Sequence, residues 1–141
     1  MIWTTHLLVI ANRTVDSPEL CDALLARAEQ GPVEVTLLAP ATRELGRDAR
    51  AQTARRLDDA LRSLRDAGLD ADGVVGDPDP MLALDEVWDP ARFDEIIVVT
   101  LPETASRWLA AHLPRRVESF TGARVTHLVA HSPEGARIGA R

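Results

Sequence analysis

Five short apolar runs alternate along the chain with longer amphipathic stretches. Each run has the length of a buried strand and is followed by polar turn residues, glycine or proline. The stretches between the runs repeat their apolar residues every three or four positions, which is typical of helices packed by one face. We therefore expect strands at residues 6–11, 33–39, 71–76, 94–100 and 124–130. Helices are expected at residues 18–30, at 48–67, from 80 to 88, and once or twice between 103 and 121.

Polar residues at the starts of these elements have ordinary structural interpretations. Ser17 precedes a proline and suits a helix N-cap, and the segment 77–80 (DPDP) offers two more cap-plus-proline starts. Asp77 and Asp79 could instead hold Mg²⁺ beside a phosphate, but the capping interpretation is favoured. The carboxylates at 94 and 95 are expected to mark the solvent side of a strand.

The aromatic residues and the cysteine are interpreted as packing residues. Trp108 falls in the same helical stripe as Leu113 and Phe120, so it is expected to dock on the sheet. Trp88 and Trp3 are read in the same way. Cys21 lies within the apolar stripe of the first helix and is expected to be a small buried residue.

The alternation of strands and helices predicts an α/β fold, a doubly wound five-stranded parallel sheet with helices on both faces. One domain over residues 1–130 accounts for all the elements, and residues 131–141 lack periodicity and are expected to form a disordered tail. Sheets of this kind bind ligands beyond the carboxyl ends of their strands, where the winding direction reverses. The strand exits are therefore the candidate site.

Composition and charge restrict the classes of protein to which this chain can belong. The 141 residues carry a formal net charge of −6, which disfavours a nucleic-acid binder. The predicted second helix is rich in arginine, but aspartates at 48, 58, 59 and 66 are expected to cancel its field. No apolar run approaches the roughly 18 residues of a membrane span, and a single cysteine forms no internal disulfide. We expect a cytoplasmic protein without a membrane partner. The histidines at 112, 127 and 131 lack the spacing of metal ligands.

Four segments in order resemble the universal stress protein family. LLVIANRT (7–14) is similar to its opening strand, GVVGDPDP (73–80) to the turn after its third strand, FDEIIVVT (93–100) to the strand before its nucleotide loop, and ARVTHLV (123–129) to its closing strand. The resemblance covers roughly residues 5–130. It implies a single Rossmann-like domain with roles in stress response or signalling, and it implies a homodimer.

The resemblance also implies an adenine-nucleotide site, with two departures in this chain. The family loop G-x2-G-x9-G-[ST] after the fourth strand is absent, because Thr100 stands where the first glycine would follow the strand. Asn12 stands in place of the aspartate that contacts the base, although an amide can still donate and accept. If the site is retained, the resemblance places Asn12 and Ala39 near the base. The remaining candidates are Arg13 and Thr14, Gly76 and Asp77 near the ribose, and Thr100, Ser106 and Arg107 toward the phosphates.

Two functional interpretations remain open. In the first, the protein is a non-catalytic universal stress protein-like domain that binds an unknown protein partner and has a degenerate nucleotide site. In the second, it binds ATP, AMP or another adenine nucleotide through a modified anion site. No serine has the setting of a hydrolase nucleophile, so no enzymatic activity is expected. The closing strand, as an edge, is expected to form the homodimer.

Overall fold

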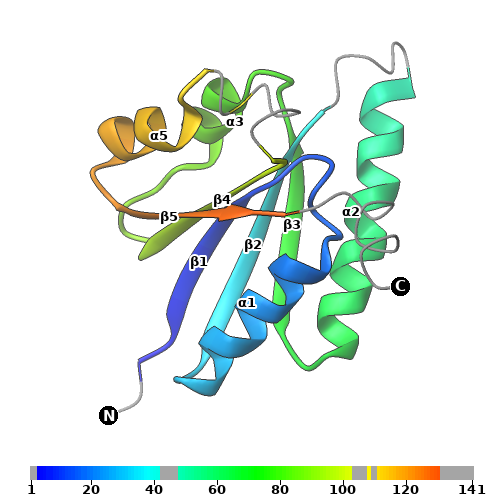
Figure 1. The fold of residues 1–141 in the computed structure, drawn as a ribbon, viewed down its shortest axis with the longest axis vertical. Helices are drawn as coiled ribbons and strands as arrows, with labels where there is room; N and C mark the ends of the chain where they lie inside the picture. Colours follow the sequence, from blue (N-terminus) through cyan, green and yellow to red (C-terminus); the bar gives the residue numbers. More distant parts are fainter. Residues whose placement is uncertain (1–2, 42–47, 103–107, 109–110, 131–141) are drawn as a thin grey trace.

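Five parallel strands form one sheet in the order β3-β2-β1-β4-β5 (Figure 1). The computed structural model describes residues 3–41, 48–102, 108 and 111–130. Along the chain the strands run outward from β1 to β2 and β3, and then from β4 to β5 on the other side. This is the predicted doubly wound α/β fold. The strands are β1 (Thr5–Ile10), β2 (Val33–Pro40), β3 (Asp70–Gly76), β4 (Glu95–Thr100) and β5 (Arg124–Val129).

The centre of the sheet is apolar on both faces, as the unbroken apolar runs predict. Four consecutive residues of β1, from Leu7 to Ile10, are fully buried, and so are the central residues of β4. β1 pairs with β2 from Thr5 opposite Val33, and with β4 from Leu7 opposite Glu95. The winding reverses between β1 and β4, so the predicted ligand position lies beyond the ends of these two strands.

Helices α1 (Pro18–Glu29) and α2 (Ala49–Asp66) cover one face of the sheet. Leu20 and Leu24 of α1 and four of the five buried residues of α2 pack with the odd-numbered residues of β1 and β2. The buried positions of α2 repeat at three- and four-residue spacing and form the predicted stripe. They are Thr53, Leu57, Ala60, Leu61 and Leu64.

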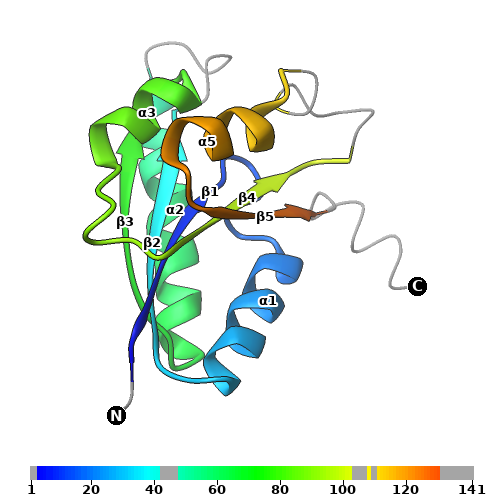
Figure 2. The same cartoon turned by 90° about the vertical axis from the view of Figure 1, so that its left-hand side faces the viewer.

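Helices α3 (Pro80–Val87) and α5 (Leu113–Thr121) cover the other face and lie near the carboxyl ends of the strands (Figure 2). Leu84 and Leu113 are buried there. Trp88 packs against this cluster and stacks on Phe93 with ring centroids 6.1 Å apart. Trp108 is partly buried against the same cluster, which confirms its interpretation as a packing residue.

The helix starts use the capping residues that the sequence indicates. Ser17 Oγ accepts a hydrogen bond from the Leu20 amide at 3.3 Å, and Asp79 Oδ1 accepts one from the Met81 amide at 2.9 Å. Each bond satisfies an amide that the first helical turn leaves without a partner. The capping interpretation of Asp79 is therefore confirmed.

Two aromatic residues differ from expectation. Trp3 lies before the first strand and is 78% exposed, so its interpretation as a packing residue is wrong. Phe120 is 48% exposed, because the last turn of α5 extends past the cluster that buries Leu113 and Val117. Cys21 is only partly buried, at the rim of the α1 stripe.

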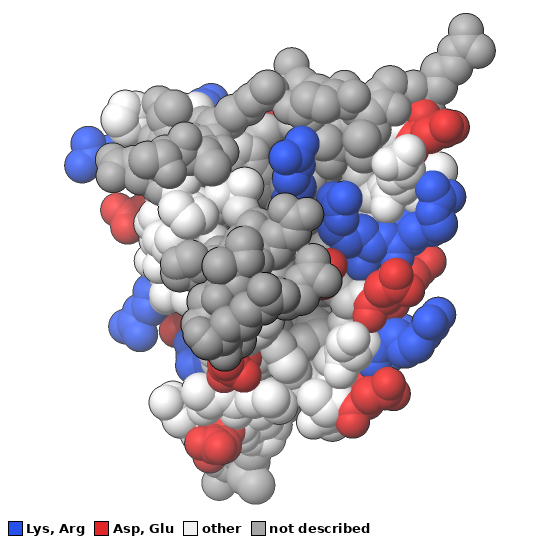
Figure 3. Space-filling view, turned by 45° about the vertical axis from the view of Figure 1, so that its right-hand side comes forward, with Lys and Arg blue, Asp and Glu red and all other residues white. Residues whose placement is uncertain are grey.

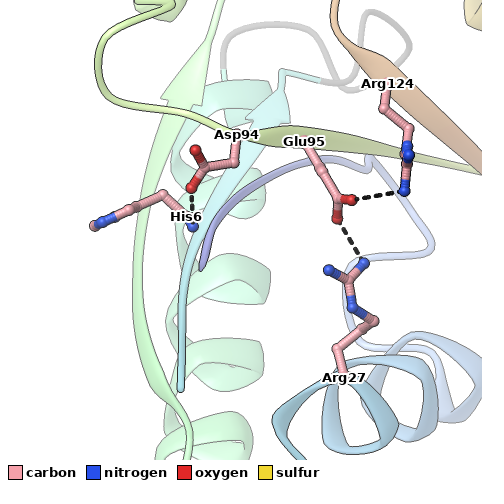
Figure 4. Close-up of polar contacts among 5 residues, drawn as sticks. All are labelled: His6, Arg27, Asp94, Glu95 and Arg124. Carbon is pink, nitrogen blue, oxygen red and sulfur yellow. Dashed lines mark hydrogen bonds and ion pairs between the residues drawn. The ribbon is translucent and has the colours of Figure 1, made fainter. Parts of the chain in front are cut away.

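An ion-pair network ties together three elements at the amino ends of the strands (Figure 4). Glu95 on β4 lies 2.6 Å from Arg27 of α1 and 3.5 Å from Arg124 of β5, and its side chain is only 16% exposed. Asp94 accepts a hydrogen bond from the backbone amide of His6 at 2.8 Å, and its own amide donates to the His6 carbonyl. Glu95 is thus a partly buried structural residue rather than a marker of the solvent side.

Within the part of the chain that the structure describes, none of the helices combines the length and the apolar character that crossing a membrane requires.

Candidate functional site

The fold brings the predicted site residues together along one edge of the sheet. Because all five strands are parallel, the exits of β3, β2, β1 and β4 are neighbours. Two backbone hydrogen bonds extend the pairing just past the strand ends, from the Ala11 amide to Leu38 and from the Ala41 amide to Gly76. Ser106 and Arg107 lie outside the described residues, so the site is built here from the other seven.

The exit of β1 forms a tight turn directed at β4. Thr14 is buried, and its hydroxyl donates to the Val99 carbonyl at 3.3 Å. The Val15 amide donates to the Asn12 carbonyl at 3.3 Å and closes the turn. Asn12 is partly buried and Arg13 is exposed. The hydrogen bond of Thr14 therefore joins the end of β1 to β4, so this side chain has a structural role.

The residue at the end of β4, Thr100, has a hydroxyl that already forms a hydrogen bond within the protein. Thr100 is buried, and its Oγ1 lies 2.7 Å from Nε2 of His127 on β5, a hydrogen bond whose direction depends on the imidazole tautomer. The Ala130 amide also donates to the Thr100 carbonyl at 2.8 Å. A hydroxyl beside an imidazole is the arrangement of a nucleophile and its base, but the burial of Thr100 keeps a substrate from reaching its hydroxyl.

His127 contributes to the candidate site, and the sequence alone did not predict this. Its strand position was read correctly, but its partner depends on the register of β5 against β4, in which His127 lies opposite Val98. That register places the side chains of Thr100 and His127 on the same face of the sheet. A strand pattern alone does not fix the register, and the sequence carried no other signal for this pair.

The exit of β3 is shaped by the approach of α3. A Cβ atom on Gly76 would lie 2.6 Å from the Cβ of Ala83 and 3.0 Å from Cδ1 of Leu38. This close packing favours glycine at position 76. Asp77 Oδ1 accepts a hydrogen bond from the Asp79 amide at 2.9 Å, so Asp77 stabilises the turn that leads into α3.

Ala39 and the segment after β4 complete the edge. Ala39 is fully buried, and its side chain packs in the core beneath α1 and α2. Leu101 and Pro102 follow β4 and are partly buried. Proline has no amide hydrogen and a fixed φ, so Pro102 does not offer the close backbone approach that a glycine gives to a phosphate.

The described residues at this edge hold no cluster of metal ligands, and a cavity that the described part of the chain does form lies elsewhere. Among the described residues, no group of three or more His, Cys, Asp and Glu side chains is placed to hold a metal ion. A cavity of about 540 Å³ lies at the opposite edge, near the amino ends of β1, β2 and β3. Its lining includes His6, Glu34 and Asp70, and none of the predicted nucleotide residues contributes to it.

Comparison with solved structures identifies the fold. The chain superposes with a TM-score of 0.55 on a crystal structure of a universal stress protein in complex with cAMP. The two sequences are 17% identical, and the match covers 91% of this chain and 97% of the other. No protein-family model matches the sequence, and neither does any curated protein. The universal stress protein-like fold predicted from the four sequence segments is thus confirmed as a fold.

Proposed function

We propose that this protein is a non-catalytic universal stress protein-like domain that acts in stress response or signalling by binding a protein partner, and that its adenine-nucleotide site is degenerate. The observation that carries the proposal is the pairing of polar groups at the exits of β1 and β4. Thr14 bonds to Val99, and Thr100 bonds to His127. These hydroxyls stabilise the edge of the sheet and are not directed at a ligand.

The glycine at the β3 exit supports the same conclusion. Gly76 leaves space for Ala83 of α3, so packing of the helix accounts for its lack of a side chain. After β4, Thr100 is followed by Leu101 and Pro102 where a nucleotide loop would supply glycine amides. These contacts within the protein, at positions where the family resemblance places the ribose and phosphates, support the proposal of a degenerate site.

A second candidate function is the binding of an adenine nucleotide. It is favoured by the structural neighbour, which is a complex with cAMP, and by Asn12, a partly buried amide at the β1 exit that could pair with an adenine edge. Under this candidate, Asn12→Ala weakens the binding of adenosine and of AMP alike. Under our proposal, the same variant behaves as the wild type with both ligands.

Thermal unfolding distinguishes the two candidates. A ligand present at 100 times its dissociation constant adds about 2.7 kcal/mol to the free energy of unfolding. The melting temperature is measured with millimolar adenosine, AMP and cAMP, with and without Mg²⁺. We expect no shift with any of them. A shift that Asn12→Ala abolishes would replace our proposal with the second candidate.

We also propose that the domain forms a homodimer through β5. This edge strand has an exposed outer side, and Val129 is 43% exposed in a strand whose apolar residues otherwise contact the core. An unpaired strand edge can pair with a second copy. Light scattering at micromolar concentration should give the mass of a dimer, and Val129→Lys should give a folded monomer. A monomeric mass for the wild type would contradict this assembly.

A further inference from the structure

β3 forms one edge of the sheet that the described strands build, with β2 as its neighbour. Along a parallel strand, the N–H and C=O groups of successive residues point alternately to the two sides of the strand. The Gly76 carbonyl points toward β2, because it accepts a hydrogen bond from the Ala41 amide just past the end of β2. The backbone groups of Ala71, Gly73 and Val75, which lie an odd number of residues before Gly76, therefore point outward from the sheet.

Two of these outward-pointing carbonyls accept hydrogen bonds from arginines of α2. Arg50 Nη2 donates to the Val75 carbonyl at 3.1 Å, and Arg65 Nε donates to the Ala71 carbonyl at 2.9 Å. The backbone groups at a strand edge are otherwise a template on which another chain can add a strand. A guanidinium group thus lies beside β3 at each end of its outward-facing stretch.

Arg65 is held at this edge by a second contact. Its Nη2 atom lies 3.1 Å from Oδ1 of Asp72 on the same strand. The two side chains are 53% and 79% exposed, so the ion pair itself adds little to the free energy of unfolding. A planar guanidinium that binds two acceptors has a fixed orientation. Asp72 therefore keeps Arg65 against the strand rather than free in solvent.

The close approach of α2 to β3 lets both arginines reach the edge. A short turn joins the two elements, which run in opposite directions and lie side by side (Figure 1). A Cβ atom on Gly73 would lie 2.8 Å from Cδ1 of Leu57, in the middle of the helix. Glycine at position 73 thus gives the helix room beside the strand. Arg50 and Arg65 lie near the two ends of α2 and flank this contact.

The overall charge of α2 does not account for these two contacts. The helix contains five arginines and three aspartates, and Figure 3 shows basic and acidic side chains close together on this side of the molecule. Another of its arginines, Arg62, lies 3.8 Å from Asp59 of the same helix, and both side chains are 74% exposed. Arg50 and Arg65 differ from Arg62 because they donate to the backbone of a neighbouring strand.

We propose that Arg50 and Arg65 block the outer edge of β3 against pairing with another copy of this chain. A strand that paired there would lie about 4.8 Å from β3, in the space that the two guanidinium groups occupy. It would have to displace both charged groups from the carbonyls that they bind. The block directs strand pairing to β5 at the opposite edge, a consequence that rests on the homodimer proposed above. Pairing at one edge closes a dimer, whereas pairing at both edges allows open-ended growth.

Light scattering of the full-length protein from micromolar to millimolar concentration tests the block. The variant Arg50→Met/Arg65→Met keeps apolar stems of similar length and removes both guanidinium groups. We expect its mass to exceed that of the wild type by about twofold or more, because both edges can then pair. Arg55→Met/Arg62→Met is the matched control. It removes the same charge from exposed positions of the same helix and should keep the wild-type mass.

A further substitution shows whether the association uses β3. Val74 lies on this strand and is 40% exposed, and a lysine on an edge strand opposes pairing. Adding Val74→Lys to Arg50→Met/Arg65→Met should restore the wild-type mass. Association that persists in this triple variant would come from another surface or from unfolding, and it would overturn the proposal.

The block and the homodimer at β5 fail on different results. An unchanged mass for Arg50→Met/Arg65→Met, or an equal increase in the control variant, overturns the block. A monomeric wild type contradicts the homodimer alone. In that case the block predicts that Arg50→Met/Arg65→Met forms a dimer that Val74→Lys dissociates, and a monomeric Arg50→Met/Arg65→Met would overturn both.

Discussion

Substitution of Gly76 by alanine tests whether this glycine serves the fold or a ligand. The added Cβ would lie 2.6 Å from the Ala83 Cβ and 3.0 Å from Leu38 Cδ1. Carbon atoms in contact normally lie about 3.5 to 4.0 Å apart. Helix α3 must therefore move away from β3 by roughly the difference, about 1 Å. Gly76 is absent from the glycines with a positive φ, so the backbone itself accepts alanine.

The expected change in the free energy of unfolding of Gly76→Ala is the sum of two opposing effects. Overpacking of this kind costs about 1 to 3 kcal/mol. Replacing glycine with alanine also stiffens the unfolded chain, which returns about 0.4 to 1 kcal/mol. The net loss in the free energy of unfolding should be about 1 to 2 kcal/mol. In a domain of this size that loss lowers the melting temperature by roughly 3 to 8 °C.

The assay is thermal and urea unfolding of Gly76→Ala, of Ala83→Gly and of the double variant. Ala83→Gly costs about 1 kcal/mol in a helix but removes the atom that the new Cβ would meet. The double variant should therefore be more stable than the sum of the two single changes, by about 1 kcal/mol. An unchanged melting temperature for Gly76→Ala, or strictly additive effects, would refute the packing argument and return Gly76 to the candidate ligand contacts.

Substitutions at three other residues probe a helix cap, an ion pair and an exposed aromatic side chain. Asp79→Ala removes the acceptor for the Met81 amide and should cost about 1 kcal/mol in urea unfolding, whereas Asp79→Asn should retain most of the stability. Glu95→Gln leaves Arg27 without its carboxylate and should cost about 1 to 2 kcal/mol, a value between exposed and fully buried pairs; the same loss in 1 M salt would contradict an electrostatic cause. Trp3→Ala should change the free energy of unfolding by less than about 0.5 kcal/mol, because Trp3 is 78% exposed.

The course of the chain could be predicted because its signals are local and agree with one another. Apolar runs with turn residues marked all five strands within one or two residues, and Ser17 and Asp79 marked helix starts that the structure confirms. These features depend on spacing and on short-range hydrogen bonds, which a sequence displays directly.

The candidate site was only partly predictable, because its character depends on contacts between distant residues. Thr100 was identified as a strand-end residue, but its hydrogen bond to His127 requires the register of β5. Gly76 was read through the family resemblance as a ligand contact, and only the position of Ala83 reveals its packing role. The exposure of Trp3 could not be predicted locally, because the residues around it do not show whether another part of the chain packs on its side chain.

The measurement that tests the central claim most directly is the melting temperature of the wild type and of Asn12→Ala with adenosine, cAMP and ATP. The account predicts that none of the three ligands produces a shift in either protein. A stabilisation by adenosine or cAMP that is lost in Asn12→Ala would show a working adenine site at the β1 exit and would contradict the degenerate site proposed here.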